Sequence, residues 1–320
     1  MEARKQFKYC IVGLGAHAIN KIVPAIEQSG NSLCAVVTSQ NPSPITAVPS
    51  FGTLHDAVDV LPRECIYILS SPPAIHFEQA RLLASNGLDV IIEKPAFLTF
   101  RDAKEVAELA SSQGGSVIEG FMHRYSDTYA TAVSCFSENT EKIVGIKSSF
   151  TVPQLPSNTF RSDAEIHSSV LYDIGCYIVS FCVDVELEDL ALSVVKYVYR
   201  EQDNHEHVVL KGLGSGMQLD FDFGVADEYC NELTLFFDNG NYSKFAPFYF
   251  GRPGSRSYQQ FHGKEIVEYQ IVETNTFANM LSTNFKPSGQ LIRSTNIVSI
   301  AAQLEGLAKE IEQRRLKNLM

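Results

Sequence analysis

Long apolar runs, basic clusters and paired cysteines are all scarce in this chain of 320 residues. No apolar run approaches the roughly 18 residues needed to cross a bilayer. The opening "MEARKQFK" leads within a few residues into an expected strand and leaves no room for a signal-peptide core. A net charge of −11 without any basic cluster disfavours a nucleic-acid partner. We therefore expect a cytoplasmic protein with neither a membrane nor a nucleic-acid partner.

Cysteine and histidine spacings give no sign of a metal site. The seven cysteines form no CxxC, and several lie in apolar runs such as "CIVG" and "LCAVV". This pattern favours small buried side chains in a reducing compartment over disulfides. His205 and His207 flank Glu206 and would share one face of a strand, but no third ligand is evident. We predict a solvated hairpin there and no metal.

The pattern of apolar residues changes at about Tyr125. Before it, apolar runs such as "AVV" and "VII" alternate with helical patterns, which is typical of a parallel sheet covered on both faces. After it, stretches such as "MQLDFDFG" alternate apolar and polar residues and are joined by turns such as "DNGN". We predict an α/β protein with a Rossmann doubly wound parallel sheet, followed by an α+β domain with an open, mostly antiparallel sheet. The expected domains are 1–124 and 125–288, with a helix in 289–320 packing back on the first.

The helical patterns have recognisable ends. They cover about 16–28, 76–86, 100–113, 167–183 and 289–314. Pro24 interrupts the first pattern and should kink or tighten it. Thr99 is the expected N-cap of the helix 100–113, and Gly114 its C-terminal stop.

The stretch "GLGAHA" follows the first strand and opens the first helix. Gly13 would allow the tight turn, Gly15 a close approach of the backbone to a pyrophosphate, and Ala18 close packing of helix and strand. The free N–H groups at the helix start would face the phosphate charge. The glycine spacing is common by itself, but its place between strand and helix favours a dinucleotide site.

Three further motifs follow in order. "EKP" places Glu93, Lys94 and Pro95 at the end of a strand, "SSPPAIH" places Ser71, Pro72 and His76 at the end of another, and "LYDIGCY" sets Asp173 and Tyr177 four residues apart on a helix. Together with the glycine motif, this set resembles the glucose-fructose oxidoreductase/inositol dehydrogenase (Gfo/Idh/MocA) family over nearly the whole chain.

The resemblance implies an NAD(P)-dependent oxidoreductase that acts on a CH–OH group of a sugar, cyclitol or related compound. Lys94 would hold the substrate oxygen and stabilise developing negative charge. Tyr177 stands where many members carry histidine. A free tyrosine has a pKa near 10, so acid–base work would need a nearby cation such as Lys94, and Asp173 would orient the substrate or that lysine. The alternative for Tyr177 is a packed core tyrosine. The resemblance also suggests a cis peptide before Pro95.

Other positions complete the expected site. The expected cofactor-binding residues are Gly13, Gly15, Ala16, His17, Ala18, Ser39, Gln40, Ser71, Pro72, His76, Glu93 and Lys94. His123, Arg124, Arg161 and His167 are the expected substrate-binding residues. Arg161 is equally well interpreted as a surface residue. His167 stands in "HSSVLYD", where the family has a glycine-rich turn, and is equally well a helix-start residue.

The sequence does not decide between NAD and NADP. The second strand ends in "VVTSQNPS", without the acidic residue that binds the ribose diol of NAD. No lysine or arginine lies between Asn31 and Pro62 to bind a 2′-phosphate either. Ser39 and Gln40 would bond either form, and we favour NADP slightly over NAD.

Two other functions fit the same fold. One is a redox-elimination glycosidase with a tightly held NAD, and the other is a dinucleotide-sensing regulator without catalysis. The presence of both the lysine and the tyrosine disfavours the regulator, and the oxidoreductase remains the leading hypothesis. A broad antiparallel sheet favours a homodimer or homotetramer. The sequence names neither the sugar nor the direction of the reaction.

Overall fold

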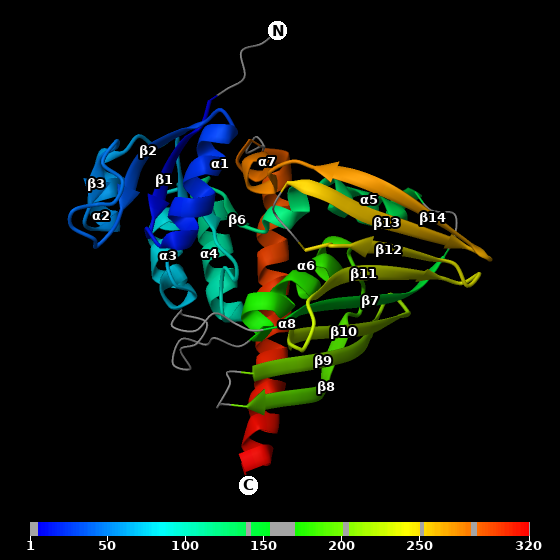
Figure 1. The fold of residues 1–320 in the computed structure, drawn as a ribbon. Coiled ribbons are helices and arrows are strands. Elements are labelled where there is room, and N and C mark those ends of the chain that lie inside the picture. Colours follow the sequence, from blue (N-terminus) through cyan, green and yellow to red (C-terminus); the bar gives the residue numbers. More distant parts are fainter. Residues whose placement is uncertain are drawn as a thin grey trace. The chain divides into compact units, whose positions relative to one another are not determined.

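The computed structural model describes residues 6–138, 142–153, 170–200, 205–249, 253–282 and 287–319. The chain divides into two compact units, each with its own sheet (Figure 1). Unit 1 comprises Met1–Met122 and Phe277–Ala301, and unit 2 comprises His123–Thr276 and Ala302–Met320. No helix in these described ranges is long and apolar enough to span a membrane.

Unit 1 contains a parallel sheet of six strands. They are β1 (Lys8–Val12), β2 (Ser32–Val37), β3 (Ser50–Phe51), β4 (Cys65–Leu69), β5 (Val90–Ile92) and β6 (Val117–Glu119), in the order β3-β2-β1-β4-β5-β6. The chain starts in the middle of the sheet and extends it first to one side and then to the other. All five residues of β4 are buried, as expected for a strand covered on both faces. The predicted Rossmann arrangement is confirmed.

Helices pack against this sheet. They are α1 (Val23–Gln28), α2 (Leu54–Val60), α3 (His76–Ser85), α4 (Phe100–Gln113) and α7 (Thr276–Ser282), with a π-helix η1 (Ala18–Ile22) and a 3₁₀ turn η2 (Pro73–Ile75). Strand residues such as Val12 and Ile92 share one core with Leu83 of α3 and Val106 of α4. Each such side chain contributes about 1.5–3 kcal/mol by leaving water.

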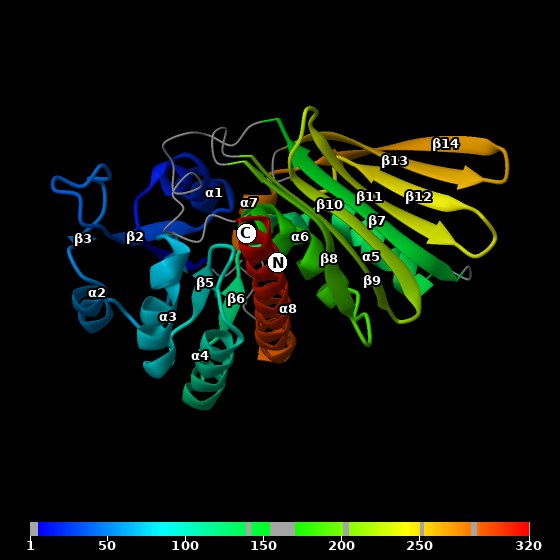
Figure 2. The same cartoon turned by 90° about the horizontal axis from the view of Figure 1, so that it is seen from below.

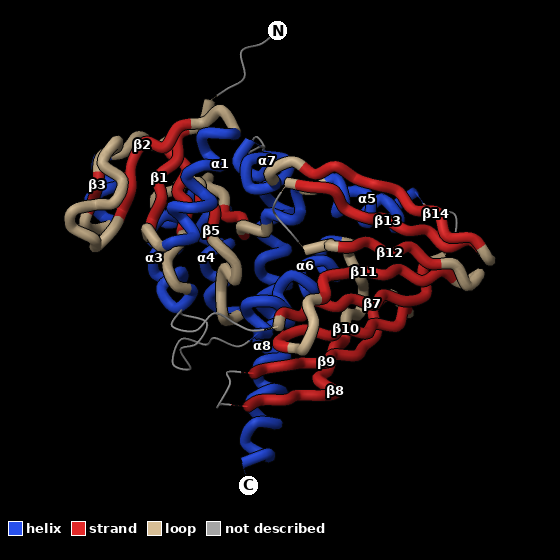
Figure 3. The backbone as a smooth tube through the Cα atoms, viewed as in Figure 1, coloured by secondary structure: helices blue, strands red, loops and turns tan. Residues whose placement is uncertain are grey.

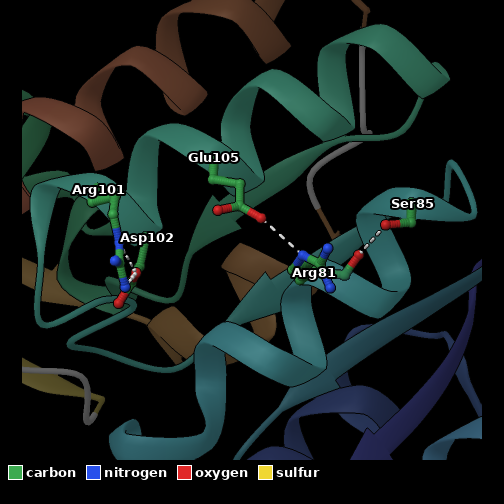
Figure 4. A network of polar contacts seen from close by, with 5 residues as sticks. All are labelled: Arg81, Ser85, Arg101, Asp102 and Glu105. Carbon is green, nitrogen blue, oxygen red and sulfur yellow. Dashed lines mark hydrogen bonds and ion pairs between the residues drawn. The ribbon is translucent and has the colours of Figure 1, made fainter.

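The ends of α4 are as the sequence predicts. The Thr99 hydroxyl accepts the N–H of Asp102 at 3.2 Å, and Gly114 follows the helix with φ of +78°. On the outer surface, Arg81 of α3 donates to Glu105 of α4 at 2.8 Å (Figure 4). Both side chains are largely exposed, so this pair adds little to stability.

The first helix differs from its expected form. We predict that Pro24 kinks or tightens it, but the turn before the proline is widened into the π-helix η1. Proline has no N–H for the preceding turn, and its ring clashes with the carbonyl four residues earlier. A wider turn relieves that clash while the chain stays helical.

Unit 2 contains an eight-stranded sheet (Figures 1 and 3). Its strands are β7 (Ile143–Val152), β8 (Ala191–Arg200), β9 (His205–Gly214), β10 (Met217–Val225), β11 (Cys230–Phe237), β12 (Tyr242–Ala246), β13 (Gly254–His262) and β14 (Glu265–Glu273), in the order β14-β13-β12-β11-β7-β10-β9-β8. Only β7 and β10 pair in parallel within this sheet. The expected mostly antiparallel sheet is confirmed.

Helical segments line one face of this sheet (Figure 2). They are the 3₁₀ turn η3 (Met122–Tyr125), α5 (Asp127–Glu138), the π-helix η6 (Leu171–Gly175) and α6 (Cys176–Asp184). The last helix, α8 (Pro287–Leu319), is continuous (Figure 3). Its Glu310 accepts the N–H of Val194 at 2.9 Å, and its Arg314 donates to the Val194 carbonyl. These bonds satisfy backbone groups of the edge strand β8 that would otherwise invite another strand.

Candidate cofactor site and catalytic residues

The motif residues of unit 1 follow the carboxyl ends of neighbouring strands. Backbone N–H groups just beyond four strands donate to the adjacent strand at 2.7–2.9 Å: Gly13 to Val37, Ser70 to Val12, Glu93 to Leu69 and Gly120 to Ile92. These bonds align the glycine loop, the "SSPP" loop and the "EKP" loop along one edge of the parallel sheet. That edge is where open α/β sheets bind their ligands.

The two glycines of "GLGAHA" have different roles. Gly13 has φ of +90°, and a Cβ there would lie 2.9 Å from the Ser71 backbone nitrogen. The turn and its neighbour strand therefore require glycine. At Gly15 a Cβ would meet nothing within 4 Å, and the residue is exposed at the start of the helix. The fold leaves open space there, in front of helix N–H groups that can bind a phosphate.

His17 connects the glycine loop to the "EKP" motif. Its Nε2 lies 3.4 Å from Oε1 of Glu93, within ion-pair distance when the ring is protonated. The ring also packs edge-on against Phe277, with centroids 5.6 Å apart. His17 is half exposed and Glu93 is largely buried. Two predicted cofactor-site residues from separate strand ends therefore lie together.

Two buried polar side chains hold the backbone beside Lys94. His76, which is 1% exposed, places Nδ1 3.1 Å from the Pro95 carbonyl and Nε2 2.9 Å from the Ser71 carbonyl. Burial lowers the pKa of His76, and the carbonyl contacts oppose that shift. Glu119 accepts the Ala96 N–H at 2.8 Å. The Lys94–Pro95 peptide is cis, as the resemblance suggests.

Sequence reasoning singled out His76 but missed Glu119. An acidic residue at the end of an apolar strand, in "VIEG", was the available signal. Because Glu119 is 4% exposed and accepts a backbone N–H, it supports the loop that presents Lys94. Lys94 itself is half buried.

The remaining cofactor-site candidates lie on the adjoining loops. Gln40 follows β2, and its amide donates to the Leu14 carbonyl at 2.9 Å, which ties the second strand end to the glycine loop. Ser39 is exposed beside it. The Ser71 hydroxyl donates to Gln79 at 2.5 Å, and Pro72 precedes the turn η2.

Tyr177 of unit 2 lies in an aromatic cluster. Its ring centroid is 5.0 Å from that of His123, 5.8 Å from Phe150 and 5.9 Å from Tyr249. Tyr177 is 7% exposed and His123 is fully buried. The Tyr249 hydroxyl contacts the Ser148 hydroxyl at 3.1 Å, and burial raises the pKa of Tyr249 above its usual value.

The "DIG" motif has a packing reason. Asp173 and Gly175 lie on the π-helix η6, and Asp173 is one turn before Tyr177 of α6. A Cβ on Gly175 would lie 2.8 Å from the Phe223 ring of β10, so glycine lets this turn contact the sheet. The N–H of Val170 donates to Glu206 of β9 at 2.7 Å. The half-buried Asp173 is thereby fixed one turn from Tyr177.

The expected substrate-binding residues divide into two groups. Arg124 forms a bidentate ion pair with Asp184, at 2.6 and 2.8 Å, and the Tyr129 hydroxyl donates to the same carboxylate at 2.5 Å. Arg124 thus holds η3 to α6, beside His123. Arg161 and His167 lie outside the described residues. The sequence analysis did not identify Asp184, because an aspartate at a helix end outside any motif gives no sign of its partner.

The expectation of no metal concerned His205 and His207. His207 places Nε2 2.6 Å from Asp222 of β10. Across the part of the chain that the structure describes, no group of three histidine, cysteine or acidic residues is arranged to hold a metal ion.

Residues 7–121 match the family described as "Oxidoreductase family, NAD-binding Rossmann fold" (GFO_IDH_MocA). This match covers all six strands of the parallel sheet of unit 1. The resemblance found from the motifs is confirmed, and so is the expectation of NAD or NADP as the cofactor.

Two curated relatives are sugar enzymes by name. The chain is 23% identical over 178 residues to "D-xylose 1-dehydrogenase (NADP(+)) 2" from Haloferax volcanii, an alignment covering 53% of this chain and 54% of that protein. It is 23% identical over 243 residues to "dTDP-3,4-didehydro-2,6-dideoxy-alpha-D-glucose 3-reductase" from Streptomyces antibioticus, covering 72% of this chain and 73% of that one. The chain therefore spans about half of the first relative's length and about three quarters of the second's.

Solved structures share the whole fold. The 3-ketoreductase KijD10 from Actinomadura kijaniata, in complex with NADP and TDP-benzene, superposes with a TM-score of 0.81 at 16% identity, over 96% of this chain and 98% of that one. The aldose-aldose oxidoreductase from Caulobacter crescentus gives 0.81 at 17% identity, over 97% and 98%. The expected enzyme class, an oxidoreductase, agrees with the family description and with the names of all four proteins, and two of these names include NADP.

Proposed function

We propose that this protein is an NADP- or NAD-dependent oxidoreductase that interconverts a hydroxyl and a keto carbon of a sugar derivative. The observation that carries the proposal is the row of strand ends in unit 1. It aligns the open space at Gly15 with the "EKP" loop that holds Lys94. One edge of the sheet thus offers both a phosphate cradle and a cationic side chain.

The residues present fit a dinucleotide. The backbone around Gly13 and Gly15, with the helix start at Ala16–Ala18, would hold the pyrophosphate. Ser39 and Gln40 would bond the ribose, and Ser71 and Pro72 would line the next loop. When bound, the nicotinamide supplies the hydride acceptor or donor. NADP is favoured, because no acidic residue follows β2 and the two relatives that name a cofactor name NADP.

Lys94, Tyr177 and Asp173 are the proposed catalytic residues. The Lys94 ammonium would bind the substrate oxygen and stabilise the negative charge that develops on it. The Tyr177 hydroxyl would exchange the proton of that oxygen, with Asp173 orienting the substrate. KijD10 has been crystallised as a tyrosine-to-phenylalanine variant and as lysine-to-alanine and lysine-to-glutamate variants, which are the residue types proposed here.

The substrate is proposed to be a carbohydrate, either free or nucleotide-linked. The relatives include a free-sugar dehydrogenase and a reductase of a dTDP-linked sugar. His123 supports Tyr177 through its ring contact, and Arg161 and His167 remain candidate substrate contacts. A screen of free aldoses against dTDP-linked keto sugars separates the two classes.

The first experiment is a fluorescence titration with NADPH and, separately, with NADH. The chain contains no tryptophan, so the reduced nicotinamide is observed with little protein background. We expect binding, tighter for NADPH. Absence of binding, together with no dinucleotide released on denaturation, would contradict the proposal. A dinucleotide that copurifies and is never turned over would instead support the redox-elimination reaction.

The second experiment tests the catalytic residues on the substrate found. We expect Lys94→Ala and Tyr177→Phe to lower kcat about 100- to 10,000-fold, the usual contribution of a positioned acid–base group, while NADPH still binds. Lys104→Ala is a matched control at an exposed lysine and should keep full turnover. Full turnover by Lys94→Ala would refute its assigned role.

We also propose that the chain forms a homodimer or homotetramer through the sheet of unit 2. The edge strand β14 exposes apolar side chains, including Ile266 (59%) and Val272 (72%). Such exposure on a broad sheet is typical of a covered surface. Light scattering should give a multiple of 35.5 kDa, and a monomer at micromolar concentration would contradict this assignment.

A further inference from the structure

Two cysteines of unit 1 bring their sulfur atoms into contact. Cys34 on β2 and Cys65 on β4 place their Sγ atoms 3.2 Å apart, and both are free thiols. The strand β1 lies between these two strands in the sheet. From the sequence alone, the cysteines are expected to be separate buried side chains, and their spacing gives no sign of this pair.

A β-bulge explains how Cys34 reaches Cys65. In the pairing of β1 with β2, Tyr9 is opposite Leu33 and Cys10 is opposite Ala35, so Cys34 is the extra residue. Because it has no partner on β1, Cys34 can move without disrupting the ladder. Cys65 is the first residue of β4 and directly follows a turn. A disulfide requires the sulfurs to approach to about 2.05 Å and the two Cα atoms to lie within about 7 Å of each other. Because β1 lies between the two strands, the bond forms only with backbone movement, which the bulged Cys34 supplies.

The two thiols differ in access and in acidity. Cys34 is partly exposed, whereas Cys65 is fully buried. The hydrogen bond between the two thiols lowers the pKa of Cys34 and its partial burial opposes that shift, while the nearby Lys8 ammonium lowers the pKa further. The hydrogen bond, burial and the neighbouring acidic groups, Glu64 among them, raise the pKa of Cys65. A partly exposed thiol with a lowered pKa beside a buried thiol is the arrangement of an attacking and a resolving cysteine.

We propose that Cys34 and Cys65 form an oxidisable dithiol, in which a peroxide or a disulfide such as oxidised glutathione reacts first at Cys34. With hydrogen peroxide, the Cys34 thiolate takes one oxygen to become a sulfenic acid and releases hydroxide. The Cys65 sulfur then attacks the Cys34 sulfur, forming the disulfide and releasing water. Two thiols and one peroxide give one disulfide and two waters. The reaction needs neither the cofactor nor a sugar, so it is independent of the proposed activity.

Trypsin separates the two cysteines cleanly. Cleavage after Lys21, Arg63 and Arg81 gives the peptides 22–63 and 64–81, each with a single cysteine, and Cys10 falls in a third peptide. The reduced full-length protein is treated with one equivalent of hydrogen peroxide, quenched with N-ethylmaleimide, digested without reductant and examined by mass spectrometry. We expect the 22–63 and 64–81 peptides to be linked, and dithiothreitol to separate them.

Variants test the order of the reaction. In Cys65→Ser, Cys34 should proceed to sulfinic acid or retain a glutathione adduct, whereas Cys230→Ser, a matched change at another partly buried cysteine, should keep the cross-link. If Cys65→Ser does not fold, the linked peptides 22–63 and 64–81 from the wild-type protein are sufficient to test the proposal. Over-oxidation of wild-type Cys34 without a link, or a link from Cys65 to Cys10 instead, would overturn the proposal.

Discussion

Replacing each glycine of "GLGAHA" by alanine should separate folding from cofactor binding. Gly15 has open space around its Cβ position and no positive φ. Gly15→Ala should therefore leave the free energy of unfolding unchanged or raise it by about 0.4–1 kcal/mol, because alanine restricts the unfolded chain. The added methyl group fills the space proposed for the pyrophosphate. Losing one charge-assisted hydrogen bond there costs about 1.5–3 kcal/mol, which corresponds to roughly 10- to 150-fold weaker binding of NADPH.

Gly13→Ala, in contrast, should lower the free energy of unfolding. Its φ of +90° disfavours a side chain, and its Cβ would collide with the Ser71 backbone. The left-handed conformation alone costs about 1–2 kcal/mol, so we expect a loss of stability of at least this size. Urea unfolding followed by circular dichroism measures it.

The control is Gly306→Ala on α8, where a Cβ also meets nothing within 4 Å. It should stabilise the helix by about 0.5–1 kcal/mol and leave NADPH binding unchanged. Wild-type affinity in Gly15→Ala, or wild-type stability in Gly13→Ala, would refute this division of roles.

Two further predictions concern buried polar groups. Asp184→Ala leaves the largely buried Arg124 guanidinium without its carboxylate and should lower the free energy of unfolding by up to about 3 kcal/mol, the lower end of the cost of breaking a fully buried pair. The triple variant Asp184→Leu, Arg124→Met and Tyr129→Phe removes the carboxylate together with the guanidinium and the hydroxyl that bond it, and should recover most of that loss in urea denaturation. Equal losses in both variants would contradict the ion-pair explanation. Burial lowers the pKa of His76, so the folded protein favours the neutral ring. The contribution of His76 to the free energy of unfolding is therefore complete above about pH 6.5, the pKa of a histidine in the unfolded chain. It decreases as the pH falls below that value, because the unfolded chain binds the proton before the folded protein does. In His76→Gln this part of the pH dependence of the urea midpoint should disappear, and an unchanged profile would exclude His76 as its source.

The sequence by itself determined the helices and strands whose ends carry a strong local signal, such as a capping residue or a turn glycine. Thr99 and Gly114 bound α4 at its observed residues, because a capping hydroxyl and a left-handed glycine act within a few residues of the chain. The alternating pattern of unit 2 predicted an antiparallel sheet for the same local reason. The final helix is longer than its expected range of 289–314, since helix ends without caps are weakly marked. The sequence did not predict the π-helical turn before Pro24, because a proline disturbs the preceding turn without determining whether it tightens or widens.

Only the tertiary structure decided which distant residues meet. His17 contacts Glu93, His76 and Glu119 hold the backbone around Pro95, and these pairings depend on the order of strands in the sheet. Arg124 pairs with Asp184 across 60 positions of sequence. The contact of Cys34 with Cys65 depends on a single bulged residue. A sequence motif predicts the chemical role of a residue and its place on a strand or helix. Which distant residue it contacts depends on how the strands and helices pack.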